Sequence, residues 1–99
     1  MTTLPESLPV QRRQTACFSV IATAEPGTMS RVLEIFAKRG LVPDRWLSAV
    51  ADPRGGELHI DIQLADADAG LVERLAQSLR QVVSVQSVLT SEKRVLISA

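Results

Sequence analysis

Residues 57–64 place the strictest limit on the fold, because apolar and polar side chains alternate along them without a break. In an extended chain one side then carries only apolar residues, namely Leu58, Ile60, Ile62 and Leu64. The other side carries Glu57, His59, Asp61 and Gln63. Such a strand belongs to a sheet that is packed on one face and exposed to water on the other. The rest of the chain must supply a layer that covers the packed face.

Two segments have the period of an amphipathic helix and can supply that layer. In the first, apolar residues recur at the i, i+3, i+4 and i+7 positions, namely Met29, Val32, Leu33 and Phe36. Gly40, which follows two basic residues, is typical of a helix end. The second segment has the apolar stripe Val72, Leu75, Ala76 and Leu79. Either Asp66 or Asp68 is placed to cap its N-terminus.

Three further stretches are expected to be strands, which gives the order βαββαβ. Thr15–Thr23 is apolar or small on both faces and is expected to be central, Val42–Ala51 leads into a tight reversal at Asp52–Gly56, and residues 83–88 alternate near the end of the chain. Right-handed crossovers place both helices on one face of a four-stranded antiparallel sheet with strand order 4-1-3-2. The predicted fold class is α+β, ferredoxin-like.

The second strand lies at an edge of this sheet, and an unprotected edge invites pairing with another chain. We therefore predict a homodimer joined through the second strand. Trp46 lies on that strand, either in the core or at the interface.

The two ends of the chain lack a clear helical or strand pattern. Residues 1–13, which include Arg12 and Arg13, are expected to form a flexible N-terminal arm. Residues 14–90 form the predicted domain, and residues 91–99 form a C-terminal tail. The apolar patch Val95–Ile97 in this tail either adds a strand or contacts a partner.

Composition excludes several classes of protein. A chain of 99 residues is long enough for one domain and too short for two. Its formal net charge is zero and it has only three aromatic residues, so neither electrostatic binding of nucleic acid nor base stacking on the sheet is expected. No apolar run approaches the roughly 20 residues that cross a bilayer, and no secretory signal is visible. With a single cysteine, the chain is predicted to be cytoplasmic, with no nucleic-acid or membrane partner.

Catalytic groups are scarce. His59 is the only histidine and falls on the polar side of its strand, Cys17 has no neighbouring base or cation in sequence, and Asp66 and Asp68 are better explained as helix caps. We therefore expect no enzyme, no catalytic residue, no metal site and no cofactor in this chain.

The turn before the first helix is the remaining candidate site. Gly27 stands alone, without the lysine of a P-loop or the further glycines of a dinucleotide-binding fingerprint. A helix N-terminus beside a residue without a side chain suits a small carboxylate or no ligand at all.

The segment "TAEPGTMSRVLEIFAKRGL", taken with the strand before it, resembles the ACT domain, an amino-acid-sensing regulatory module. The resemblance covers roughly Thr15–Leu89 and implies the ferredoxin-like fold predicted above. Its matching residues are Glu25, Pro26, Gly27, Met29, Val32, Phe36, Arg39, Gly40 and Leu41.

Within that family, the chain is most similar to the short regulatory subunit of acetolactate synthase, also called acetohydroxyacid synthase. The similarity rests on "GTMSRVLEIFAKRGL", on the second strand that ends in "DPRGG", and on "LRQVVSVQSV". It implies a non-catalytic subunit of branched-chain amino-acid biosynthesis that binds and activates the catalytic subunit, to which thiamine diphosphate would belong. The alternative is a free-standing ACT sensor that binds an amino acid or small carboxylate and regulates another protein.

The resemblance also implies where an amino-acid effector would bind. In ACT dimers the effector lies between the turn of one chain and the start of the second strand of its mate, here residues 24–29 and 41–43. The implied effector-binding residues are Ala24, Glu25, Pro26, Gly27, Thr28, Met29 and Val42. Valine-responsive small subunits have asparagine at the positions of Ala24 and Val42, so the absence of both amides leaves valine sensitivity doubtful. On exposure and topology alone, and not from the resemblance, the candidate surfaces for the catalytic partner are the sheet face with His59 and Asp61, and the tail Val95–Ile97.

Overall fold

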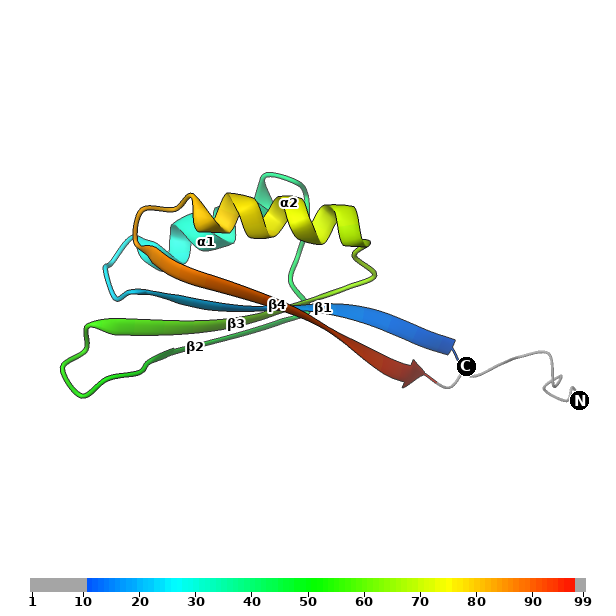
Figure 1. Ribbon diagram of the computed structural model, residues 1–99, viewed down its shortest axis with the longest axis horizontal. Helices are drawn as coiled ribbons and strands as arrows, with labels where there is room; N and C mark the ends of the chain where they lie inside the picture. Colours follow the sequence, from blue (N-terminus) through cyan, green and yellow to red (C-terminus); the bar gives the residue numbers. More distant parts are fainter. Residues whose placement is uncertain (1–10, 98–99) are drawn as a thin grey trace, which may run out of the picture.

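The computed structural model describes residues 11–97, and its elements follow the predicted βαββαβ order (Figure 1). The elements are β1 (Gln11–Thr23), α1 (Thr28–Ala37), β2 (Arg45–Val50), β3 (Glu57–Ala65), α2 (Ala69–Arg80) and β4 (Val85–Ile97). Both helices lie on the same face of the sheet, as predicted. The fold is therefore α+β and ferredoxin-like.

The four strands form one antiparallel sheet in the order β2-β3-β1-β4, which confirms the predicted order. The central strands pair so that Phe18 lies opposite Ile62 and Val20 lies opposite Ile60. These four side chains are at most 1% exposed. The apolar side of β3, read from alternation alone, faces the helices.

Aromatic packing joins this sheet face to α1. The rings of Phe18 and Phe36 meet edge to face, with centroids 5.6 Å apart and an interplanar angle of 82°. Val32 lies one turn earlier on the same side of α1 and is also fully buried. From α2, Leu75 and Leu79 complete this core.

The start of α2 and the end of α1 have the residues that the sequence predicted for them, an aspartate cap and a glycine. The carboxylate of Asp68 accepts the backbone N–H of Leu71 at 2.8 Å, so Asp68, and not Asp66, caps α2. At the end of α1, Gly40 adopts a φ of 70°, and Leu41 N–H donates to the carbonyl of Phe36 at 3.0 Å. Glycine favours this left-handed conformation because it has no Cβ.

Only two of the four apolar residues predicted to pack under α1 are in the core. Val32 and Phe36 are buried, whereas Met29 and Leu33 are 44% and 46% exposed. The reason is that α1 lies toward β2, which is the last strand of the sheet on that side, so part of the stripe extends past the covered surface. Helical period predicts a stripe but not where the sheet under it ends.

The prediction for β2 was too long at its start. The strand begins at Arg45 and not at Val42, and Val42 is 82% exposed. Asp44 explains the later start, because its backbone N–H donates to Gln63 C=O at 2.8 Å and its carboxylate accepts the N–H of Ala65. The chain joins the sheet only at this point. The predicted reversal at Asp52–Gly56 is present, with the Asp52 carboxylate accepting Gly56 N–H at 2.9 Å.

Both predicted ends need correction within the described residues. β1 begins at Gln11, so residues 11–13 of the predicted arm belong to a strand. β4 continues to Ile97, so residues 91–97 of the predicted tail extend the last strand instead of adding another. Residues 91–97 pair with residues 11–17, from Ser91 opposite Cys17 to Ile97 opposite Gln11. Backbone pairing between distant segments overrides a polar sequence that resembles a loop. The other residues of the predicted arm and tail lie outside the described residues.

Candidate effector site

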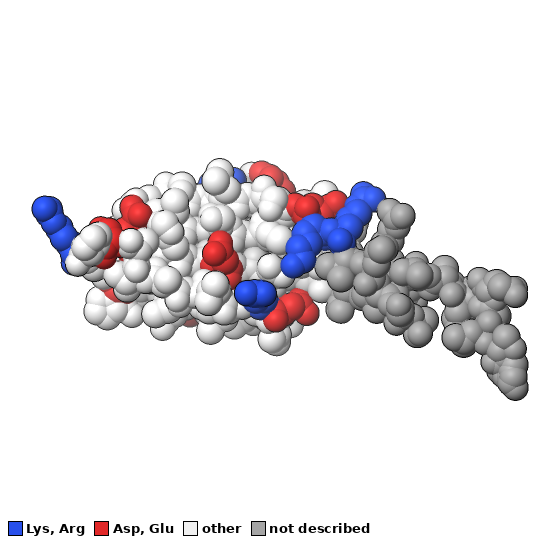
Figure 2. Space-filling model, turned by 90° about the horizontal axis from the view of Figure 1, so that it is seen from below, with Lys and Arg blue, Asp and Glu red and all other residues white. Residues whose placement is uncertain are grey.

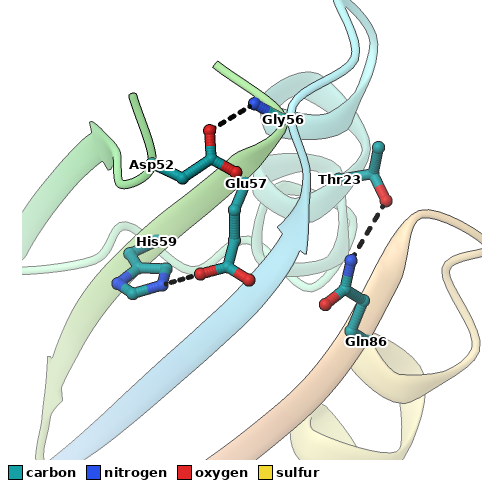
Figure 3. A network of polar contacts seen from close by, with 6 residues as sticks. All are labelled: Thr23, Asp52, Gly56, Glu57, His59 and Gln86. Atoms are coloured by element: carbon teal, nitrogen blue, oxygen red, sulfur yellow. Dashed lines mark hydrogen bonds and ion pairs between the residues drawn. The ribbon is translucent and has the colours of Figure 1, made fainter. Parts of the chain in front are cut away.

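The turn between β1 and α1 is held by backbone bonds to two neighbouring loops. Thr23 N–H donates to Ser84 C=O at 2.8 Å, and Ala24 N–H donates to Gly56 C=O at 3.1 Å. Gln86 also donates to the Thr23 hydroxyl at 3.3 Å, as Figure 3 shows beside the Asp52–Gly56 bond. The turn is therefore fixed on one side by the β2–β3 reversal and on the other by the start of β4.

Thr28 faces the interior of the molecule. Its side chain is fully buried, and its hydroxyl donates to Thr23 C=O at 2.9 Å. Since a hydroxyl has one proton, the hydroxyl of Ser84, 3.0 Å away, is the donor of the second bond. Ser84 is itself only 5% exposed. In this conformation the Thr28 side chain points into the fold and joins the turn to the α2–β4 connection.

We expect Thr28→Val to lower the free energy of unfolding by about 1–3 kcal/mol, because it leaves the buried Ser84 hydroxyl without its partner at almost unchanged side-chain volume. Denaturant unfolding at fixed protein concentration measures the change. Thr90→Val, at an exposed position of β4, is the matched control and should have little effect. Adding Ser84→Ala should recover part of the loss, and a double variant less stable than Thr28→Val would contradict the assignment.

Other predicted effector residues of this turn lie closer to solvent. Glu25 and Pro26 are exposed, Ala24 and Gly27 are half-buried, and Ala24 packs against the core. Met29 is exposed and its sulfur lies 3.3 Å from the Ser48 hydroxyl of β2. The turn therefore presents a short, weakly polar surface next to the outer edge of the sheet.

Gly27 leaves room for Arg31. Its φ is −87°, which any residue adopts, so backbone strain does not explain the glycine. A Cβ at this position would lie 3.4 Å from the Arg31 guanidinium carbon. The guanidinium is folded back over the turn, as expected of a side chain one helical turn farther along. Within the described part of the chain it has no ion-pair partner. The sequence-based prediction assigned no cation to this turn.

The structure does not bring Val42 to the turn within one chain. The turn precedes α1 and Val42 follows it, and a helix of ten residues is about 15 Å long. The predicted site therefore needs a second copy of the chain to bring its two halves together.

The remaining candidates form no catalytic or metal-binding cluster. His59 Nε2 lies 2.9 Å from Glu57 Oε1 on the open face of the sheet, and both side chains are more than a third exposed (Figure 3). Cys17 is half-buried on the same face. The described residues contain no group of three or more histidine, cysteine or acidic side chains that could hold a metal ion. Among them there is also no helix with the length and hydropathy needed to span a membrane.

The open face of the sheet carries few charges near its centre (Figure 2). Asp61 of β3 lies opposite Leu47 of β2 and Ser19 of β1, and Ser19 lies opposite Leu89 of β4. The sequence predicted the polar side chains of β3 on this face. It did not predict that the two edge strands, β2 and β4, would place Leu47 and Leu89 on the same face, where they are 54% and 67% exposed.

Comparison with known proteins identifies the family. A model of the ACT-like domain matches residues 4–95. Among solved structures, the ACT domain from GTP pyrophosphokinase of Chlorobium tepidum is 14% identical, with a TM-score of 0.67 over 78% of this chain and 96% of that one. The C-terminal domain of the MgtC protein from Mycobacterium tuberculosis is 16% identical, with a TM-score of 0.64 over 92% and 94% of the two chains.

The regulatory subunit of aspartate kinase from Thermus thermophilus is 14% identical, with a TM-score of 0.62 over 91% of this chain and 63% of that one. No curated protein sequence matches. Structural likeness at these identities establishes the shared fold, and the family model covers nearly all of the chain. The chain therefore belongs to the family of ACT-like domains.

Proposed function

We propose that the chain is a non-catalytic regulatory subunit that acts as a homodimer, joined along α1 and β2. The observation that carries the proposal is a strip of apolar side chains along this edge, defined here as the edge strip: Met29, Leu33, Trp46 and Val50. Three of them are 44–57% exposed, and Trp46 is half-buried. The contact between Met29 and Ser48 joins the two elements that carry the strip. Covering it with a second copy removes apolar surface from water.

The edge of β2 is better suited to self-pairing than the edge of β4. Along β2, Arg45 is the only charged residue, and it stands at the first position. The exposed part of β4 carries Glu92, Lys93 and Arg94 in succession, and charges on an edge strand oppose pairing. Pairing of β2 with its copy therefore extends the sheet across the dimer, and β4 remains the outer edge.

Such a dimer also supports an effector site. The turn of one copy would then approach Val42 of its mate, which a single chain cannot achieve. The N-terminus of α1 at this turn favours a ligand with a carboxylate, such as an amino acid. The proposed contacts are Ala24, Glu25, Pro26, Gly27 and Met29 from one copy, with Val42 from the other. Thr28 contributes by fixing the turn.

We assign the regulated enzyme as acetolactate synthase on the similarity of residues 27–41, 52–56 and 79–88 to its short regulatory subunit. The chain would bind the cytoplasmic catalytic subunit and raise its activity by binding the active arrangement more tightly than the inactive one. Thiamine diphosphate belongs to that partner. Because Ala24 and Val42 cannot hydrogen-bond an effector as side-chain amides do, valine is expected to leave the activity unchanged.

A free-standing sensor of amino acids is the second candidate. It is supported by the similar structures, which are parts of proteins with other roles, GTP pyrophosphokinase and aspartate kinase among them. This candidate needs the same dimer and the same turn but a different regulated protein.

Two measurements separate the candidates. Sedimentation of the chain with the purified catalytic subunit of the same organism should give one complex if the first proposal holds. Thermal unfolding of the chain alone, repeated with each of the common amino acids, should show a raised midpoint with at least one of them if the chain is a free sensor. If the two proteins sediment separately and an amino acid raises the unfolding midpoint of the chain, the first candidate is rejected and the second is supported.

A further inference from the structure

A groove of about 930 Å³ runs between α1 and α2 on the outer surface of the helix layer. Neither the fold nor the proposed dimer uses it. At about 100° per residue, Leu33 lies roughly 200° around α1 from Arg31, which lines the groove. The groove and the edge strip are therefore on opposite sides of α1, and a dimer through β2 leaves the groove open.

The groove concentrates positive charge. Arg31, Lys38 and Arg39 line it, and Glu34 is its only acidic residue. Glu34 Oε1 lies 3.3 Å from Lys38 Nζ, so the two arginines are left without an acidic partner there. The chain as a whole has a formal net charge of zero. The excess of cations is thus a property of this surface and not of the protein in general.

The groove also offers apolar contacts. Ile35 of α1 is half-buried and packs against the core, and Val82 and Val83 follow the end of α2. Val83 is 97% exposed, so it contributes nothing to the core. A small ligand beside so exposed a wall would keep much of its surface in water, whereas small-molecule sites bury most of their ligand. The groove is therefore better suited to a segment of a macromolecule.

We propose that this groove docks an acidic, amphipathic segment of a partner protein. Carboxylates of the segment face Arg31 and Arg39, and an aliphatic or aromatic side chain lies against Ile35 and Val83. The proposal extends the regulatory function proposed above, on which it rests for the identity of the partner. Its test uses no catalytic subunit, so the failure of one proposal is distinguishable from the failure of the other.

The test is a selection of displayed random peptides of roughly 12 residues, a little over three helical turns, on the purified full chain. Peptides bound by the unmodified chain are counter-selected on the variant Lys38→Glu/Arg39→Glu. The variant Arg54→Glu/Arg74→Glu makes the same change in charge outside the groove and is the matched control. Binding of individual peptides is then titrated, with the amide signals of the chain followed by NMR.

We expect acid-rich peptides with at least one large apolar residue to be enriched, and to shift amide signals of α1 and of residues 78–83. Their affinity should fall at least about tenfold for the groove variant and with added salt, and change little for the control variant. Val83→Ser should also weaken binding, whereas Leu89→Ser should not. No enrichment, enrichment of peptides without acidic residues, or signals that move only at the edge strip or on the open sheet face would each overturn the proposal.

Discussion

Phe36→Ala is expected to lower the free energy of unfolding by about 3–5 kcal/mol, the cost of removing a buried aromatic side chain and leaving a cavity. Phe36 is fully buried and is the only residue of α1 whose ring packs on an aromatic ring of the sheet, Phe18. Because small domains are stable by only about 5–15 kcal/mol, this one change removes a fifth or more of the total. α1 would then lose its main attachment to β1.

Denaturant unfolding at one fixed protein concentration measures this effect, since a dimer makes the midpoint depend on concentration. Val83→Ala is the control, because it removes apolar atoms from a side chain that is 97% exposed. It should change the free energy of unfolding by less than about 0.5 kcal/mol. A Phe36→Ala protein as stable as this control would show that α1 does not pack on the sheet as described.

Leu33→Glu is expected to separate the proposed homodimer into folded monomers. Leu33 lies on α1 in the edge strip and is 46% exposed in the single chain, so the change costs the isolated fold little. Glutamate is also a good helix former. In the dimer, however, its carboxylate would be buried without a partner at a cost of several kcal/mol, which weakens association at least about 100-fold.

Sedimentation velocity over a range of concentrations gives the dimer dissociation constants of the unmodified chain and of Leu33→Glu. Leu89→Glu places the same charge on an exposed leucine of the open sheet face and should leave the dimer intact. If Leu89→Glu separates the dimer and Leu33→Glu does not, the interface lies on the open face and the proposed dimer is wrong. A monomeric unmodified chain would reject it as well.

The sequence predicted the fold correctly where the spacing of apolar residues depends directly on which side chains are buried. Alternation at Leu58, Ile60, Ile62 and Leu64 identified the covered face of β3 because the side-chain period of a strand is two. The sequence did not predict that Met29 and Leu33 lie beyond the covered surface, since helical period carries no information about the width of a sheet. The ends were missed because the pairing of residues 11–15 with residues 93–97 joins distant segments.

For the site, the sequence predicted the position of the turn but not its internal contacts. The bond between Thr28 and Ser84 joins residues 56 positions apart, and no local pattern indicates it. The position of Arg31 over Gly27 could have been predicted from the sequence, because a helical side chain reaches back toward the turn that precedes it. The separation of Val42 from the turn within one chain follows from the length of α1, and the resemblance had already implied a second copy to complete the predicted site.

The most direct test of the central claim is the rate of acetolactate formation by the purified catalytic subunit of the same organism, with and without this chain, each repeated with valine. We expect the chain to raise the rate and valine to leave the raised rate unchanged. Leu33→Glu should reduce the activation if the dimer is the active form, and Leu89→Glu should retain it. A rate that the unmodified chain does not change, at concentrations where it is a dimer, would contradict its assignment as an activating subunit of acetolactate synthase.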